Sequence, residues 1–156
     1  MATQFESFFS EPSLSRIADV LPQIVCATQS DGRARYFNRR WYEYTGLTPE
    51  QSLESPWNHA VHPDDLKDCE VSWKQGIAAG RKFQVESRIR DFSGQYHWFL
   101  GHSCPSHDDN GGIACWIGVY IDIDSLKKSQ EELKLCQERF RLLAESEPQL
   151  LWICDQ

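Results

Sequence analysis

The last residues of the chain repeat the pattern of its beginning. When Pro148 is aligned with Pro22, residues 140–152 lie over residues 14–26, with Ala, Pro and Gln coinciding and the apolar positions matching. The sequence offset between the two segments equals the length of a small domain plus a linker. An internal repeat with such a period indicates how many domains the architecture contains. The repeat therefore predicts one complete module followed by the start of another at 147–156. A chance likeness between two short helix-proline-strand segments is the alternative.

Composition agrees with one folded module. The chain has 156 residues, of which 40% are hydrophobic and 12% aromatic, so it can bury a sizeable core. Its net charge of −7 argues against nucleic-acid binding, because a groove that neutralises phosphates needs a basic face. The short basic cluster between Arg33 and Arg40 is interpreted as a solvated turn and helix start.

The sequence also predicts where the segment is located. It has no run of about 18 consecutive apolar residues, and its first residues lack the pattern of a secretion signal. We expect a cytoplasmic segment without direct membrane contact. Its six cysteines show no CxxC spacing, so reduced thiols and no structural zinc are expected.

The order of elements predicts an α+β fold. Helical spacing and capping signals predict helices at residues 10–20, at 39–44, from Thr48 onward, and at 63–79. Alternating patterns between turns predict strands at 24–28, 34–37, 82–90, 95–104 and 113–123. Asn38 and His62 are predicted helix caps, and a charged helix without Gly or Pro starts at Asp124. Five strands joined in this way are expected to form one antiparallel sheet.

Several ordered blocks carry a family resemblance. They are Asp31-Gly32-Arg33, Tyr44-Thr45-Gly46, and the segments 36–41, 61–65, 92–94, 96–100 and 118–124. Over about residues 14–126 the chain resembles a PAS sensory domain, of the branch found in tandem in bacterial sensor histidine kinases. The resemblance implies a five-stranded antiparallel sheet with helices packed on one face, an N-terminal flanking helix and a long C-terminal signalling helix.

This resemblance implies boundaries and a function. The chain would consist of a flanking helix at 1–21, a PAS domain at 22–124, a signalling helix or coiled-coil linker at 125–146 and the truncated second PAS domain. Its expected role is that of a sensory module in a multidomain bacterial signalling protein. The expected parent is a sensor histidine kinase, in which further PAS or kinase domains adjoin this one. The segment itself is not expected to be an enzyme, since it has no phosphate loop or nucleophile elbow, and its paired acidic residues suit caps and turns.

Strand alternation and the resemblance together define a candidate pocket. Phe83 and every second residue after it are expected on the pocket side of the third strand, and the resemblance extends this face to the other strands. The predicted pocket residues are Ile24, Cys26, Thr28, Phe83, Val85, Ser87, Ile89, His97, Phe99, Trp116 and Tyr120. Because the repeat aligns Cys26 with Trp152, the smaller side chain could leave a cavity beside Cys26.

The sequence assigns no cofactor to this pocket. Haem bound through His97 is an alternative, with His59 and Cys26 as further candidate iron ligands. Flavin photochemistry is not expected, because the related light sensors have an Asn-Cys-Arg-Phe block where this chain has Pro56-Trp57-Asn58-His59. A spacer that dimerises without a ligand is the other alternative.

The opposite face of the sheet is expected to be apolar. Its predicted members are Trp98, Leu100, Cys104, Ile117, Val119 and Ile121. Monomeric soluble domains rarely expose such a patch, so a cover is expected. The N-terminal helix, through Phe8, Phe9, Leu14, Ile17 and Leu21, or a second copy of the chain would supply it.

The exit helix is the predicted output. Leu126, Leu133 and Phe140 recur every seven residues, and Ser129, Cys136 and Leu143 follow each of them by three. This a/d pattern predicts a homodimer paired through a parallel coiled coil; a helix folded back on its own sheet is the alternative. At the junction, Asp122, Ile123 and Asp124 form the predicted signal relay, in which Asp122 would pair with a nearby base.

Overall fold

The computed structural model describes residues 12–54 and 56–146, and the chain divides into two compact units with the boundary between Ile123 and Asp124. The helices are α2 (Pro12–Val20), α3 (Arg39–Thr45), α4 (Pro49–Glu54), α5 (Pro56–Ala60), α6 (Pro63–Ala79) and α7 (Asp124–Ser146). The strands are β1 (Ile24–Gln29), β2 (Ala34–Phe37), β3 (Phe83–Arg90), β4 (Tyr96–His107) and β5 (Ile113–Asp122). None of the described helices combines the length and the apolar composition needed to cross a bilayer.

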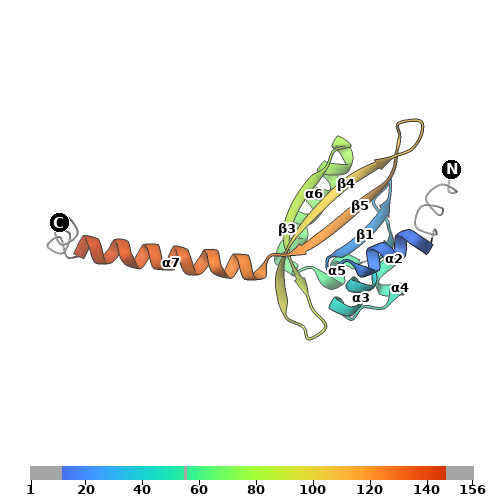
Figure 1. Ribbon diagram of the computed structural model, residues 1–156. Coiled ribbons are helices and arrows are strands. Elements are labelled where there is room, and N and C mark those ends of the chain that lie inside the picture. Colours follow the sequence, from blue (N-terminus) through green and yellow to red (C-terminus); the bar gives the residue numbers. More distant parts are fainter. Residues whose placement is uncertain (1–11, 55, 147–156) are drawn as a thin grey trace. The chain divides into compact units, whose positions relative to one another are not determined.

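The five strands form one antiparallel sheet in the order β2-β1-β5-β4-β3, which confirms the predicted architecture (Figure 1). β4 runs three residues further than predicted, because Ser106 still pairs with Cys115 and His107 with Ile113. The turn that follows is correspondingly short. The Asp108 carboxylate closes it by accepting hydrogen bonds from the backbone N–H groups of two later residues, at 2.9 and 2.8 Å.

A hydrophobic core lies between the sheet and the helices that follow β2. Its buried members are Ile24, Cys26, Phe37, Trp41, Ala60, Ile89, Phe99 and Tyr120. Phe37 and Trp41 stack with 4.5 Å between ring centroids, so the first turn of α3 is fixed against β2. The short helix α5, which the sequence did not predict separately, contributes Ala60 to this core.

Asn38 occupies the N-cap position of α3, but its side chain does not cap that helix. Its carboxamide oxygen accepts from Val25 N–H at 2.9 Å, and its NH₂ donates to the carbonyls of Ala18 at 2.8 Å and Gln23 at 3.0 Å. The predicted capping hydrogen bond is therefore wrong, because the fully buried side chain satisfies three backbone groups of α2, β1 and the bend between them instead. His62 does cap α6, accepting from Asp64 N–H at 3.2 Å.

The outer face of the sheet is partly covered within the described residues. Trp98, Leu100, Ile117 and Val119 are half-buried, and Ile121 is 39% exposed. Ile17 of α2 is 58% exposed and Leu21, which follows that helix, is 40% exposed, so these two side chains do not supply the predicted cover. Phe8 and Phe9 lie outside the described residues, as does the side chain of Leu14.

The second unit consists of α7. Apolar side chains of the predicted heptad are largely exposed on it, at 54% for Leu126, 60% for Leu133 and 71% for Phe140, and Cys136 is exposed as well. An ion pair between Asp124 and Lys128, at 2.7 Å, stabilises the first turn of this helix. The proposed second repeat at 147–156 lies outside the described residues.

Candidate functional site

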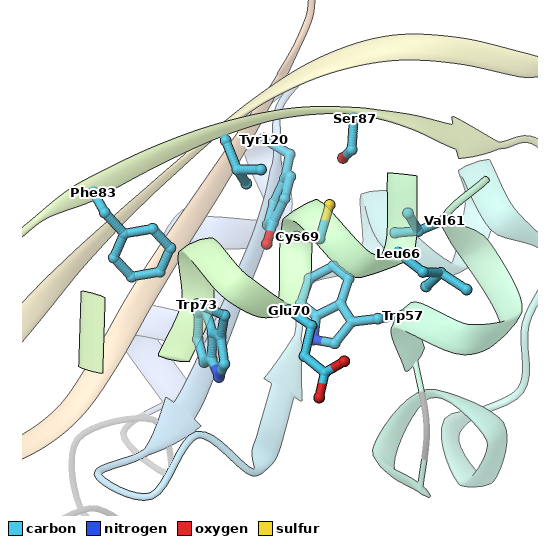
Figure 2. Close-up of a pocket in the computed structure, with 10 residues that line it drawn as sticks. Trp57, Val61, Leu66, Cys69, Glu70, Trp73, Phe83, Ser87 and Tyr120 are labelled. Carbon is cyan, nitrogen blue, oxygen red and sulfur yellow. The ribbon is translucent and has the colours of Figure 1, made fainter. Parts of the chain in front are cut away.

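A cavity of about 270 Å³ lies between the sheet and the helices α5 and α6 (Figure 2). Four aromatic rings and several aliphatic side chains form most of its wall. The lining residues are Trp57, Val61, Leu66, Cys69, Glu70, Trp73, Phe83, Val85, Ser87 and Tyr120. A concave, largely apolar site with a few polar groups is the usual form of a small-molecule site.

The helical wall comes mainly from α6. Leu66, Cys69, Glu70 and Trp73 line the cavity at the i, i+3, i+4, i+7 spacing that places side chains on one helix face. These residues, with Trp57 and Val61, were absent from the sequence prediction, which considered only strands. The helical spacing in the segment 63–79 was the signal that could have identified four of them.

The sheet wall depends on two glycines that lie under aromatic rings. A Cβ on Gly76 of α6 would come within 2.1 Å of the Phe83 ring, and one on Gly101 of β4 within 2.7 Å of the Tyr120 ring. Because these positions lack side chains, both rings lie directly against the neighbouring backbone. Phe83 and Tyr120 thereby bound the cavity on the sheet side (Figure 2).

The polar groups of the cavity carry little net charge. Burial raises the pKa of the Cys69 thiol, an effect partly offset by a hydrogen bond with Ser87, and burial also raises the pKa of Tyr120 well above its ordinary value. Both groups are neutral at pH 7. The Glu70 carboxylate is 63% exposed and lies 2.5 Å from the Lys74 ammonium, whose hydrogen bond lowers the pKa of Glu70.

Four of the predicted pocket residues line this cavity: Phe83, Val85, Ser87 and Tyr120. The others that the prediction placed on the wall are buried in the core without lining the cavity: Ile24, Cys26, Thr28, Ile89, Phe99 and Trp116. Ile24 and Phe99 instead line a second hollow, which is described below. Trp116 packs against Trp73 and Phe83, with ring centroids 6.4 and 5.9 Å away.

Cys26 is buried and does not line this cavity. The Cys26 sulfur would lie only 2.7 Å from a Cβ placed on Gly118, so β1 and β5 close tightly at this point. Burial raises the pKa of Cys26 to about 12. The small side chain is thus matched by a glycine on the neighbouring strand, and the open volume lies elsewhere.

His97 also lies outside the cavity wall. Its Nε2 atom is 3.5 Å from an Asp91 carboxylate oxygen, and its ring meets the Tyr44 ring edge-on with 6.5 Å between centroids. His59 is exposed and Cys26 belongs to the core. None of the three side chains considered as haem ligands therefore lines this cavity, and the described residues contain no group of three or more His, Cys, Asp or Glu that could hold a metal ion.

A second hollow, of about 220 Å³, lies at the end of β5. Its wall includes Arg40, Ile121 and Asp122, and it also includes Tyr120. Tyr120 therefore forms part of both walls. Beyond it, Asp122 is exposed, and the buried Ile123 donates its N–H to the Trp98 carbonyl at 2.8 Å before α7 begins.

Comparison with known families identifies this architecture. The family model of the PAS fold matches residues 34–120, which include β2, the helices around the cavity, and most of β5. The chain belongs to the PAS family. PAS domains of histidine kinases are among its homologues, and the resemblance found in the sequence is thereby confirmed.

Two relatives are much longer than the segment that they share with this chain. The chain is 31% identical over 137 residues to the uncharacterized protein y4lL of Sinorhizobium fredii, covering 88% of this chain and 16% of that protein. It is 28% identical over 148 residues to the peroxide stress-activated histidine kinase mak1 of Schizosaccharomyces pombe, covering 90% of this chain and 9% of the kinase. The PAS chain thus spans only a small part of either relative's length.

Solved structures share the fold. A PAS domain from Colwellia psychrerythraea aligns with a TM-score of 0.60 and 18% identity, covering 72% of this chain and 96% of that one. A sensory box histidine kinase/response regulator from Burkholderia thailandensis aligns with a TM-score of 0.60 and 18% identity, covering 83% of this chain and 96% of that one. An RNA-binding light-oxygen-voltage receptor aligns with a TM-score of 0.65 and 16% identity, covering 90% of this chain and 41% of that one. At these identities the likeness concerns the fold alone.

Proposed function

We propose that this PAS domain senses a small molecule bound in the cavity and passes the change through β5 to α7. The observation that carries the proposal is the position of Tyr120, whose side chain bounds both the cavity and the hollow that contains Asp122. One residue thereby connects the candidate binding site with the end of the strand that leads into the exit helix.

The packing around Tyr120 supports this route. Its ring lies against the backbone of Gly101, and its centroid is 5.3 Å from that of the Trp57 ring. A closely packed ring between two walls cannot move without displacing a neighbour. A ligand that pushes on Tyr120 would therefore shift the last residues of β5, and the relay residues Asp122 to Asp124 would change the start of α7.

The parent protein is proposed to be a sensor histidine kinase, since relatives of that class contain homologous segments. The neighbouring domains would then be further PAS domains or a kinase domain, and this segment would work in the cytoplasm. Catalysis would belong to those neighbours, and the PAS segment would control them through its helix.

The test begins with the protein as cells produce it. A native mass spectrum of the purified chain should show a retained small molecule, and an absorption spectrum would show whether that molecule is a chromophore. The variant Val85→Trp, which fills the cavity, should lose that mass. Gln84→Trp, on the exposed side of the same strand, is the matched control and should retain it. A mass retained equally by both variants, or none in the unaltered protein, would contradict ligand sensing in this cavity.

The relay can be tested separately by hydrogen exchange. Occupancy of the cavity should alter amide protection in residues 119–128 as well as at the cavity wall. Protection changes confined to the wall would show binding without the proposed transmission.

Dimerisation through α7 is a second candidate function. It is supported by the exposed apolar side chains of the heptad on a helix of 23 residues. In a parallel pair, the d-position Cys136 would face its mate. Mild oxidation of a Cys104→Ser background, which removes another exposed thiol, should give a disulfide dimer that disappears in Cys136→Ser. If the Cys104→Ser protein stays monomeric both before and after oxidation, the result would count against the coiled coil.

A further inference from the structure

The cavity wall carries the hydroxyl group of Tyr120. The residue as a whole is 5% exposed, and within the described residues its hydroxyl has no hydrogen-bond partner, although the oxygen atom itself is open to the cavity. Figure 2 shows this hydroxyl directed from β5 into the space in front of α6. A hydroxyl in this position can donate a hydrogen bond to an acceptor on a molecule bound in the cavity.

The charge of the lining restricts what that acceptor belongs to. No Lys, Arg or His is present among the lining residues, and the one carboxylate, Glu70, is already neutralised by Lys74. An anion would lose its hydration in this cavity without gaining a cation, and a cation would compete with Lys74 for the single carboxylate. The lining therefore favours an uncharged molecule.

The aromatic rings restrict its shape. Trp57 and Tyr120 lie 5.3 Å apart between centroids, and Trp73 and Phe83 lie 5.4 Å apart on the other part of the wall. Rings of this kind pack well against a further flat ring, edge-on or offset. The volume of about 270 Å³ is just below the roughly 300–1,000 Å³ typical of sites for drug-sized ligands, which suits a molecule with one ring.

On the basis of the proposed function, we infer that the cavity takes an uncharged, single-ring aromatic compound whose hydrogen-bond acceptor binds the Tyr120 hydroxyl. Aryl ketones and aryl aldehydes have this chemistry. The Ser87 hydroxyl already interacts with Cys69, so Tyr120 is the group that distinguishes a compound with an acceptor from a plain hydrocarbon.

Four probes test the inference: acetophenone, its hydrocarbon counterpart α-methylstyrene, the anion benzoate and the cation phenyltrimethylammonium. Each is titrated into the unaltered chain, Tyr120→Phe and the control Tyr44→Phe, following amide chemical shifts by NMR. Tyr44 is a tyrosine of the same domain that does not line the cavity. One neutral hydrogen bond corresponds to about a 5-fold change in affinity. We expect Tyr120→Phe to lower the affinity for acetophenone by about 5-fold and to change the affinity for α-methylstyrene by less than about 2-fold. Tyr44→Phe should change neither affinity.

The outcomes separate two failures. The probes could change the amide shifts of cavity residues while the affinity for acetophenone is the same in Tyr120→Phe, or either ion could bind more tightly than acetophenone. In both cases the ligand class is wrong, but the cavity is still a binding site. If no probe shifts the cavity residues at millimolar concentration, this ligand class is wrong. Val85→Trp and native mass spectrometry then decide separately whether the cavity binds a ligand at all.

Discussion

The substitution Asp65→Ala should reveal how α6 is held to the sheet. Asp65, in the first turn of α6, accepts three hydrogen bonds from Arg88 of β3: from the backbone N–H at 2.9 Å, from Nε at 2.9 Å and from Nη2 at 2.6 Å. The side chains of Asp65 and Arg88 are only 15% and 28% exposed. The guanidinium also lies 5.2 Å from the Trp98 ring centroid. This clamp satisfies the edge of β3 and fixes the helix that forms one wall of the cavity.

The size of the effect follows from these contacts. Hydrogen bonds to a charged group contribute about 1.5–3 kcal/mol, and bonds that share one carboxylate are not additive. Since water still reaches part of the pair, we expect Asp65→Ala to lower the free energy of unfolding by about 2–3 kcal/mol. Arg88→Ala keeps the backbone N–H and should lower it by less. The coupling between the two substitutions should therefore be about 1–2 kcal/mol.

Urea unfolding of the single and double variants measures these quantities. The control is Glu70→Ala, which removes an exposed pair with Lys74 on the same helix and should change stability by at most about 0.5 kcal/mol. Additive effects of Asp65→Ala and Arg88→Ala, or a loss no larger than that of the control, would refute the clamp.

The clamp also predicts a pH dependence. Hydrogen bonding to Arg88 lowers the pKa of Asp65 in the folded protein. A depressed folded pKa gives stability that is fully present above the unfolded value of about 3.9 and is lost as the pH falls through the folded pKa. The stability difference between the unaltered chain and Asp65→Asn should therefore be constant from pH 7 to about pH 5 and shrink below pH 4. A difference that grows on acidification would contradict this sign.

Three further predictions concern packing. Gly76→Ala should destabilise the fold by about 1–3 kcal/mol in thermal or urea unfolding, because the Phe83 ring occupies the space that the new methyl group needs. This loss should exceed the gain of about 1 kcal/mol that alanine usually brings to a helix. A more stable variant would show that the ring moves freely. Asn38→Ala should cost about 3 kcal/mol or more by urea unfolding, because it leaves three backbone groups without their partner; a loss under 1 kcal/mol would contradict this. Cys26, with a pKa of about 12, should resist a thiol reagent at pH 8 until the protein unfolds, whereas the exposed Cys104 should react at once; equal rates would show that β1 opens readily.

The sheet was predictable from the sequence because strand faces are determined locally. Alternation in β3 separates Val85 and Ser87 from Gln84 and Glu86, and the structure buries or half-buries the first pair and exposes the second. Turn residues fixed the ends of most elements for the same reason. One exception is the β4–β5 hairpin, where pairing of Ser106 with Cys115 extended the strands into a segment that was predicted to be a loop.

The cavity was less predictable because its position depends on how side chains from distant elements fill the available volume. Alternation shows that Cys26 and Trp116 face inward, but it cannot show that Gly118 closes around the first. Nor can it show that Trp73 and Phe83 cover the second. The helical wall was detectable in principle from the spacing of residues in α6. Its meaning appears only when that helix is packed on β3.

The composition of the cavity wall allows a test between a ligand sensor and a spacer. A domain that only separated or dimerised its neighbours would gain stability by closing this space, since each additional buried CH₂ contributes about 0.8 kcal/mol. Val85→Ile adds one methyl group into the cavity and should stabilise the isolated chain by up to that amount. The chain instead has the small side chains of Val85, Ser87 and Cys69 on the same cavity wall as Tyr120. If Val85→Ile stabilises the domain and weakens binding of acetophenone, the open volume is retained for a ligand at the expense of stability. If it stabilises the domain and binding is unchanged, the volume has no such role.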